Sequence, residues 1–142
     1  ARAALWVAGQ DYDHGTGHGV GAYLGVHEGP HGLARRATTP IEAGVVLSNE
    51  PGYYREGAFG IRLENLMATL PAEAIEGGDR PMHGFETLTL APIDRRLIDA
   101  ALLNSAQLDW LNGYHARVLA EIGPLVSTAC QSWLRDACAP IS

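Results

Sequence analysis

The chain changes character near residue 93, and this change constrains its fold more than any other feature. Residues 40–92 are rich in Gly, Pro and strand-forming residues, whereas residues 93–142 are rich in Ala and Leu with helical periodicity. Strands that are followed by C-terminal helices are typical of an α+β arrangement. The sequence therefore predicts a sheet in the earlier part of the chain and a helical region at its end.

Three strands are expected in the middle of the chain, where β-branched and aromatic residues are bounded by turn residues. They cover residues 44–54, 59–66 and 85–90, with a turn at 55–58 and a surface loop at 71–82. Two helices are expected after them. The first is capped by Ser105 and runs to about Ile122, with apolar residues every three or four positions. Gly123 and Pro124 end it and begin the second, because Pro suits a first helical turn.

Composition excludes several functional classes. The 142 residues carry ten basic and sixteen acidic side chains, and the net charge of −6 lacks the basic footprint of a nucleic-acid-binding domain. No apolar run approaches the roughly 18 residues of a membrane span, so no membrane partner is expected. The two cysteines, Cys130 and Cys138, are expected to be reduced thiols in a cytoplasmic protein. A folded, soluble domain is the class that remains.

A run of alternating glycines lies between Asp13 and Gly21, and it contains His14 and His18. Glycine at every second position argues against a helix and for a backbone that bends tightly or approaches another group closely. The two histidines are either metal or catalytic groups, or exposed side chains on a flexible loop, and their spacing does not decide between these interpretations. The same alternatives hold for His27 and Glu28, which follow the next apolar segment.

The strongest physical argument comes from the first two predicted strands. If they form a hairpin that turns around Gly57, residues at equal distances from Gly57 face each other, and Glu50 and Glu64 are such a pair. Two opposed carboxylates repel each other unless a shared proton or a bound cation neutralises them. Arg62 points to the same face and can help, while Pro51 keeps the preceding Glu50 extended. A register error of one residue would instead turn one Glu to solvent.

The combination of two carboxylates with imidazoles suits divalent ions such as Mn, Co or Zn. Carboxylates that bridge two ions also suit hydrolysis by a shared, activated water. Two Glu and one His are too few ligands for two ions, however, and at least two more carboxylates are needed. Asp11 and Asp13 lie near His14 in the sequence, but no geometric reason recruits them. The ligand set found in this sequence is therefore incomplete.

Four motifs in order resemble the metallopeptidases with the pita-bread fold, and most closely the Xaa-Pro aminopeptidases, also called aminopeptidase P. The motifs are His14–Gly21, Val26–Pro30, Asn49–Tyr54 and Gly60–Asn65. Three later segments resemble the long form of that family, at residues 85–93, 108–115 and 140–142. The resemblance implies the C-terminal half of a pita-bread fold, a curved antiparallel sheet with C-terminal helices. Residues 1–104 would hold the metal-site strands and loops, and residues 105–142 a helical extension.

The resemblance also implies a role for particular residues. His18 is similar to the imidazole ligand of the metal pair, and Glu64 to the carboxylate that bridges both ions. Glu50 is similar to the carboxylate ligand that also takes part in proton transfer. His14 and His27 resemble the outer histidines that contact substrate and stabilise the tetrahedral intermediate. A last position, Arg62, resembles a residue that orients the carboxylates.

The activity that the resemblance implies is removal of an N-terminal residue that precedes proline. Its cofactors would be two divalent metal ions, Mn by preference and Zn or Co as alternatives. The intact enzyme would be a cytoplasmic homodimer that acts on peptides with proline at the second position. Two Asp ligands of the family precede these motifs, in a half of the catalytic domain that this chain does not include. We therefore expect the chain alone to be inactive and to need that N-terminal half as a partner.

Two alternatives stay open beside this interpretation. The parent protein could be a prolidase or a creatinase-like hydrolase on the same fold, although intact His18, Glu50 and Glu64 argue against the metal-free relatives. It could also be a binding module without catalysis, although such proteins usually have degraded ligand positions. The residues beyond this chain would separate these possibilities, because two Asp at ligand spacing would support the enzyme.

Overall fold

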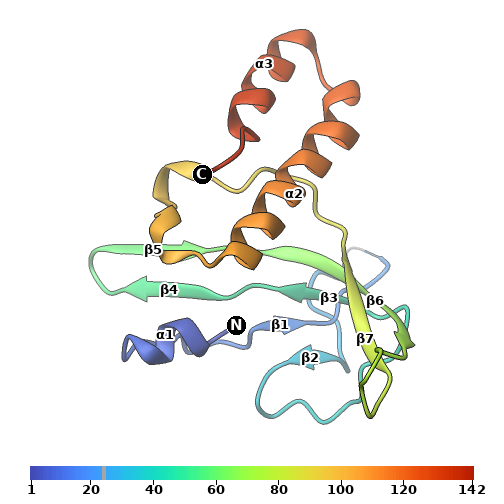
Figure 1. Ribbon diagram of the computed structural model, residues 1–142. Helices are drawn as coiled ribbons and strands as arrows, with labels where there is room; N and C mark the ends of the chain where they lie inside the picture. Colours follow the sequence, from blue (N-terminus) through green and yellow to red (C-terminus); the bar gives the residue numbers. More distant parts are fainter. Residues whose placement is uncertain (24) are drawn as a thin grey trace. The chain divides into compact units, whose positions relative to one another are not determined.

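The computed structural model describes residues 1–23 and 25–142, and these form two compact units, Ala1–Thr89 and Leu90–Ser142 (Figure 1). All strands belong to the first unit and both long helices to the second. No helix in the described part of the chain is long and apolar enough to cross a membrane. The assignment of residues 1–104 to the metal site and 105–142 to an extension concerns roles, and it stays a prediction.

The first unit is built from short antiparallel strands. Its elements are α1 (Ala3–Val7), β1 (Gly17–His18), β2 (Gly32–Leu33), β3 (Val46–Asn49), β4 (Gly52–Arg55), β5 (Phe59–Arg62), β6 (Asn65–Glu73) and β7 (Met82–Thr87). The strands pair as β1 with β2, as β4 with β5, and as a sheet in the order β3-β6-β7. Every pairing is antiparallel, as the sequence predicted.

The predicted register around Gly57 is confirmed. Tyr53 pairs with Ile61 in β4 and β5, and Ser48 pairs with Leu66 in β3 and β6, so each pair is equidistant from Gly57. Gly57 itself has a positive φ of 67°, a conformation that favours glycine in such a turn. One register therefore runs through both ladders of the hairpin.

The predicted strand boundaries need correction. Residues 44–54 form two strands rather than one, because the chain leaves the ladder at Glu50 and Pro51, and proline has no N–H to donate. Residues 59–66 likewise belong to β5 and to the start of β6. The predicted loop at 71–82 is shorter, since β6 continues to Glu73 through a register shift between Thr69 and Ala72. Pro71 lies at this irregularity, which is one of the few places where a strand accepts a proline.

The second unit contains 3-10 helices η1 (Arg95–Leu97), η2 (Ala100–Leu102) and η3 (Gly123–Leu125), and the α-helices α2 (Ser105–Ile122) and α3 (Thr128–Ala137). The predicted first helix is confirmed, but its cap is Asn104 and not Ser105. The Asn104 side chain accepts from the Gln107 amide at 2.9 Å, and the Gln107 side chain accepts from the Asn104 amide at 3.0 Å. This reciprocal arrangement satisfies two backbone donors that a helix start leaves free. Gly123 and Pro124 begin η3, and α3 starts only after Ser127.

A small core holds the second unit together. Its buried residues are Tyr114, Val118, Leu134 and Cys138. His115 is fully buried beside them, and its Nε2 accepts a hydrogen bond from the Ile93 amide at 3.1 Å. Burial lowers the pKa of His115, and the charge of Arg95 lowers it further. The imidazole is therefore held neutral in the folded chain.

Acid should weaken the second unit through His115. Because the folded state lowers the pKa of His115, the unfolded chain binds more protons at low pH. The stabilisation is complete above the ordinary histidine pKa of 6.5 and is lost as the pH falls below it. Thermal unfolding followed by circular dichroism should show a lower midpoint at about pH 5.5 than at about pH 7.5. His115→Gln keeps an acceptor but cannot titrate, so its midpoint should change less, and an equal change would contradict this assignment.

Candidate metal centre

Gly17, the first residue of β1, allows this strand to lie directly against β3. A Cβ atom on Gly17 would come within 1.9 Å of the Ser48 carbonyl oxygen, a separation that no side chain tolerates. The strand is tied there by two hydrogen bonds, from the His18 amide to Ser48 Oγ at 3.0 Å and from the Glu50 amide to the Thr16 carbonyl at 2.7 Å. This close approach brings His18 to the end of β3, where Glu50 begins the break between the two ladders.

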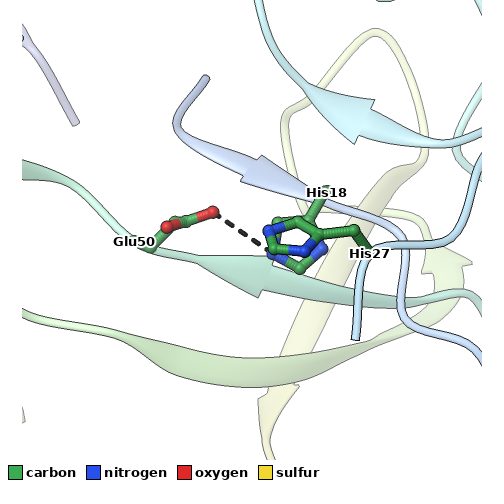
Figure 2. A group of neighbouring side chains, drawn as sticks. All are labelled: His18, His27 and Glu50. Carbon is green, nitrogen blue, oxygen red and sulfur yellow. Dashed lines mark ion pairs between the residues drawn. The ribbon is translucent and has the colours of Figure 1, made fainter. Parts of the chain in front are cut away.

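Three potential metal ligands converge at this point. One donor atom from each of His18, His27 and Glu50 lies within 4.8 Å of the other two. Figure 2 shows the two imidazoles side by side, with ring centroids 4.0 Å apart, and the Glu50 carboxylate facing them. His18 Nε2 lies 3.3 Å from Glu50 Oε1. Glu50 is buried, His18 is half-buried and His27 is exposed, so the group opens to one side.

The hydrogen bonding of His18 suits a metal ligand. Its Nδ1 lies 2.9 Å from the Gly19 carbonyl oxygen, which can only accept, so Nδ1 carries the proton. The lone pair of the neutral ring is then on Nε2, the atom that faces Glu50. A backbone carbonyl on the far nitrogen is the usual way in which proteins orient a ligating histidine. Two imidazole nitrogens with a carboxylate oxygen form a donor set that fits Zn, Co or Mn.

Arg62 separates the functions of the two Glu50 oxygens. Its guanidinium lies 3.2 Å from Glu50 Oε2, which leaves Oε1 directed at His18. The pKa of Arg62 is raised, mainly by the hydrogen bond with Tyr54 and also by the charges of Glu50 and Glu64. Glu64 is exposed and is not one of the three clustered donors. The predicted bridging role of Glu64 therefore stays a prediction, as do the roles of the other candidate residues.

His14 lies apart from the three donors but is connected to them. Its Nε2 is 2.8 Å from the Tyr54 hydroxyl, and Arg62 Nε donates to the same hydroxyl at 2.8 Å. His14 Nδ1 donates to the Gly15 carbonyl at 2.6 Å, so Nε2 accepts from Tyr54. A continuous series of polar contacts thus runs from His14 through Tyr54 and Arg62 to Glu50.

Sequence reasoning missed Tyr54, although a signal was present. Tyr54 shares its strand face with Gly52 and lies opposite Gly60. A Cβ atom on Gly52 would lie 2.5 Å from the Tyr54 hydroxyl, and one on Gly60 would lie 2.9 Å from its ring. The two glycines therefore leave the space that the Tyr54 ring fills. Paired glycines beside an aromatic residue in a hairpin indicate a ring that lies flat on the strands.

Two sequence models, which describe two regions of one protein family, match the chain. The model of metallopeptidase family M24 matches residues 1–69, and the model of the C-terminal region of peptidase M24 matches residues 81–141. The chain therefore belongs to metallopeptidase family M24. This result confirms the family that the four motifs predicted.

Individual relatives agree with this assignment. A probable Xaa-Pro aminopeptidase P of Laccaria bicolor is 46% identical over 99% of this chain and 23% of its own length. Aminopeptidase P2 of Arabidopsis thaliana is 47% identical over 100% of this chain and 21% of its own length. The crystal structure of X-prolyl aminopeptidase from Caenorhabditis elegans, described as a cytosolic enzyme with a di-nuclear active site, matches with a TM-score of 0.91. The two sequences are 44% identical, and the match covers 99% of this chain and 23% of the Caenorhabditis elegans chain.

Two facts follow from these matches. The structural match confirms the predicted fold class, an α+β arrangement that forms the C-terminal part of the pita-bread fold. The chain spans less than a quarter of the length of these relatives.

The three clustered donors predict that the chain binds one divalent ion with measurable affinity. Calorimetric titration with Zn²⁺ should show binding that His18→Ala and Glu50→Gln each weaken. Loss of a residue that only orients a metal ligand lowers metal affinity about 10- to 100-fold, so the loss of a ligand itself should be at least that large. His83→Ala is the matched control, because His83 is exposed and hydrogen-bonds the Leu70 carbonyl. Equal affinity in the wild type and both site variants would show that the cluster does not hold the ion.

Proposed function

We propose that this chain supplies one part of the dinuclear metal centre of an aminopeptidase that cleaves Xaa-Pro bonds at peptide N-termini. The observation that carries the proposal is the convergence of His18, His27 and Glu50. They converge in a chain that is 46% identical, over 99% of its length, to a probable Xaa-Pro aminopeptidase P. The remaining carboxylate ligands would come from outside these 142 residues, since the relatives are more than four times as long.

The metal ions, when bound, supply the Lewis acidity that activates water and polarises the scissile carbonyl. His18 Nε2, Glu50 and Glu64 are the ligands that we assign to them in this chain. Manganese is the metal we expect, with Zn or Co as alternatives. The localisation that we propose is cytosolic, as for the Caenorhabditis elegans relative, and a homodimer is the expected assembly.

The protein residues around the ions divide the remaining work. Glu50 Oε1 is the oxygen that accepts the proton of the attacking water, because Arg62 occupies Oε2 at 3.2 Å. In the whole enzyme, where Glu64 and carboxylates from outside this chain complete the ligand set, we do not assign His27 as a ligand. It is exposed beside His18, so it can donate a hydrogen bond to the oxyanion that develops on the substrate carbonyl. His14 is connected to Arg62 and Glu50 by the Tyr54 hydroxyl, and it is the second histidine that we expect near the substrate.

Activity should require the rest of the enzyme. The 142-residue chain with Mn²⁺ should not hydrolyse a peptide with proline at position two, whereas the full-length enzyme should. Glu50→Gln in the full-length enzyme should lower kcat by at least about 100-fold, the lower end of the effect of a general base. A matched peptide with alanine at position two tests specificity. Substantial turnover by the isolated chain, or equal rates on both peptides, would contradict the proposal.

Tyr54→Phe should isolate the contribution of the contacts that the Tyr54 hydroxyl makes with His14 and Arg62. The variant keeps the ring but removes the hydroxyl that both residues contact, so we expect kcat/KM to fall by up to about 100-fold, the order of loss that a small misplacement of active-site groups causes. Tyr53→Phe is the control, because Tyr53 points to the opposite face of the same strand. A Tyr54→Phe enzyme as active as Tyr53→Phe would show that these contacts do not support catalysis.

A further inference from the structure

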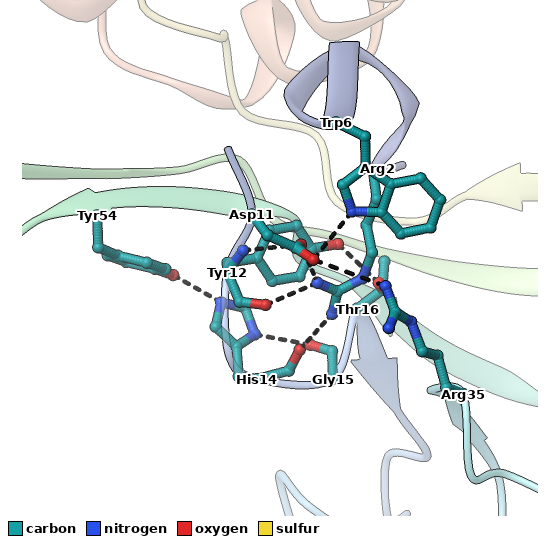
Figure 3. A network of polar contacts seen from close by, with 9 residues as sticks. All are labelled: Arg2, Trp6, Asp11, Tyr12, His14, Gly15, Thr16, Arg35 and Tyr54. Atoms are coloured by element: carbon teal, nitrogen blue, oxygen red, sulfur yellow. Dashed lines mark hydrogen bonds and ion pairs between the residues drawn. The ribbon is translucent and has the colours of Figure 1, made fainter. Parts of the chain in front are cut away.

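The segment that leads into His14 is held by helix α1 through a compact polar network (Figure 3). Arg2, at the start of α1, donates to the Tyr12 carbonyl and to the His14 carbonyl, each at 2.6 Å. Its guanidinium also stacks on the Tyr12 ring, 3.7 Å from the ring centroid. One planar side chain thus holds two carbonyls of the short segment that positions the His14 imidazole.

Asp11 fixes Arg2 in this position. Its carboxylate forms an ion pair with the Arg2 guanidinium through Oδ1, and Oδ2 accepts from the Trp6 indole at 2.9 Å. The Tyr12 amide donates to the same carboxylate at 2.8 Å. The pKa of Asp11 is lowered to about 2, chiefly by the hydrogen bond from Trp6 and then by that from the Tyr12 amide. Asp11 is therefore an anion at any pH at which a peptidase would be assayed.

Tyr12 provides a second link from this network to His14. Its ring is buried and lies 4.7 Å from the His14 ring, centroid to centroid. The Tyr12 hydroxyl forms a 2.7 Å hydrogen bond with Thr16 Oγ1, beyond His14 in the chain. The backbone on both sides of His14 is thus restrained, and the imidazole points toward Tyr54.

We propose that Arg2, oriented by Asp11, is a positioning residue for His14. By binding the Tyr12 and His14 carbonyls, Arg2 keeps His14 Nε2 within hydrogen-bonding distance of the Tyr54 hydroxyl. Through that hydroxyl, His14 stays connected to Arg62 and Glu50. Arg2 contacts neither the clustered donors nor Arg62 among the contacts described, so its influence on the reaction passes through His14. This inference rests on the proposed aminopeptidase function and adds to it a residue outside the metal-ligand motifs.

Arginine is required at this position for a geometric reason. The guanidinium offers five N–H donors in a planar fork, and here they serve one carboxylate and two carbonyls while the face of the fork covers an aromatic ring. A lysine ammonium is a single point and cannot hold both carbonyls in the same plane. Arg2→Lys should therefore retain the charge but lose most of the positioning.

The test is a double-mutant cycle in the full-length enzyme. We expect Arg2→Ala to lower kcat for an Xaa-Pro peptide by up to about 100-fold, the order of loss that a small misplacement of a catalytic group causes, with KM changed less than kcat. In a His14→Ala background the same change should have almost no further effect, because the group that Arg2 positions is already absent. Calorimetric Mn²⁺ affinity should equal that of the wild type. Losses that multiply in the double variant, or a matching loss of Mn²⁺ affinity, would overturn the proposal.

Arg35→Ala is the matched control. Arg35 approaches the same Asp11 carboxylate at 3.6 Å and lies over the Trp6 ring at 5.0 Å, but it binds neither of the two carbonyls. It should retain the wild-type kcat, and a loss equal to that of Arg2→Ala would assign the effect to the charge near Asp11 and overturn the proposal.

A readout that does not depend on activity separates this inference from the proposed function. Nitrogen-15 spectra of the His14 imidazole in the full-length enzyme should show the Nδ1–H tautomer in the wild type and in Arg35→Ala, and a mixture in Arg2→Ala. An unchanged tautomer in Arg2→Ala would overturn the positioning role even if peptidase activity is present. A shifted tautomer in a protein that does not cleave Xaa-Pro peptides would support the positioning role and reject the proposed function.

Discussion

The site depends on the contact between strand β1, which begins at Gly17, and strand β3. A methyl group on Gly17 would meet the Ser48 carbonyl at 1.9 Å, so only glycine permits the two backbones to lie this close. The hydrogen bond from the Glu50 amide to the Thr16 carbonyl stabilises this contact. Because His18 follows Gly17 directly and Glu50 follows β3, this one approach places an imidazole beside a carboxylate. Everything that the site can do chemically begins from that juxtaposition.

Beside this contact, the two oxygens of the Glu50 carboxylate have different partners. Arg62 neutralises one oxygen of the buried Glu50 and leaves the other free to face His18. Burial of an anion without a partner is costly, so the ion pair with Arg62 also stabilises the buried Glu50 carboxylate. The Tyr54 hydroxyl then joins Arg62 to His14. The carboxylate that we expect to hold metal is thereby linked to the histidine that we expect near the substrate.

A second level of support lies outside the motifs. Asp11 is not a metal ligand in this arrangement but anchors Arg2, and Arg2 binds the backbone of the His14 segment. This gives Asp11 a role that its position next to the histidine motif did not indicate. The metal-ligand motifs thus depend on a short helix, α1, that carries no motif of its own. A histidine on a glycine-rich segment needs such support, because glycine restricts the backbone less than any other residue.

The sequence by itself determined the family, the α2 helix and the hairpin register, in which residues at equal distances from Gly57 pair. These features are local, since a turn sets the pairing of its own strands and helical periodicity is read within one segment. Only the tertiary structure decided that Glu50 meets His18 and His27, that Tyr54 joins His14 to Arg62, and that Arg2 holds the His14 segment. Those contacts join separate elements, and no local pattern specifies which side chains meet when such elements pack.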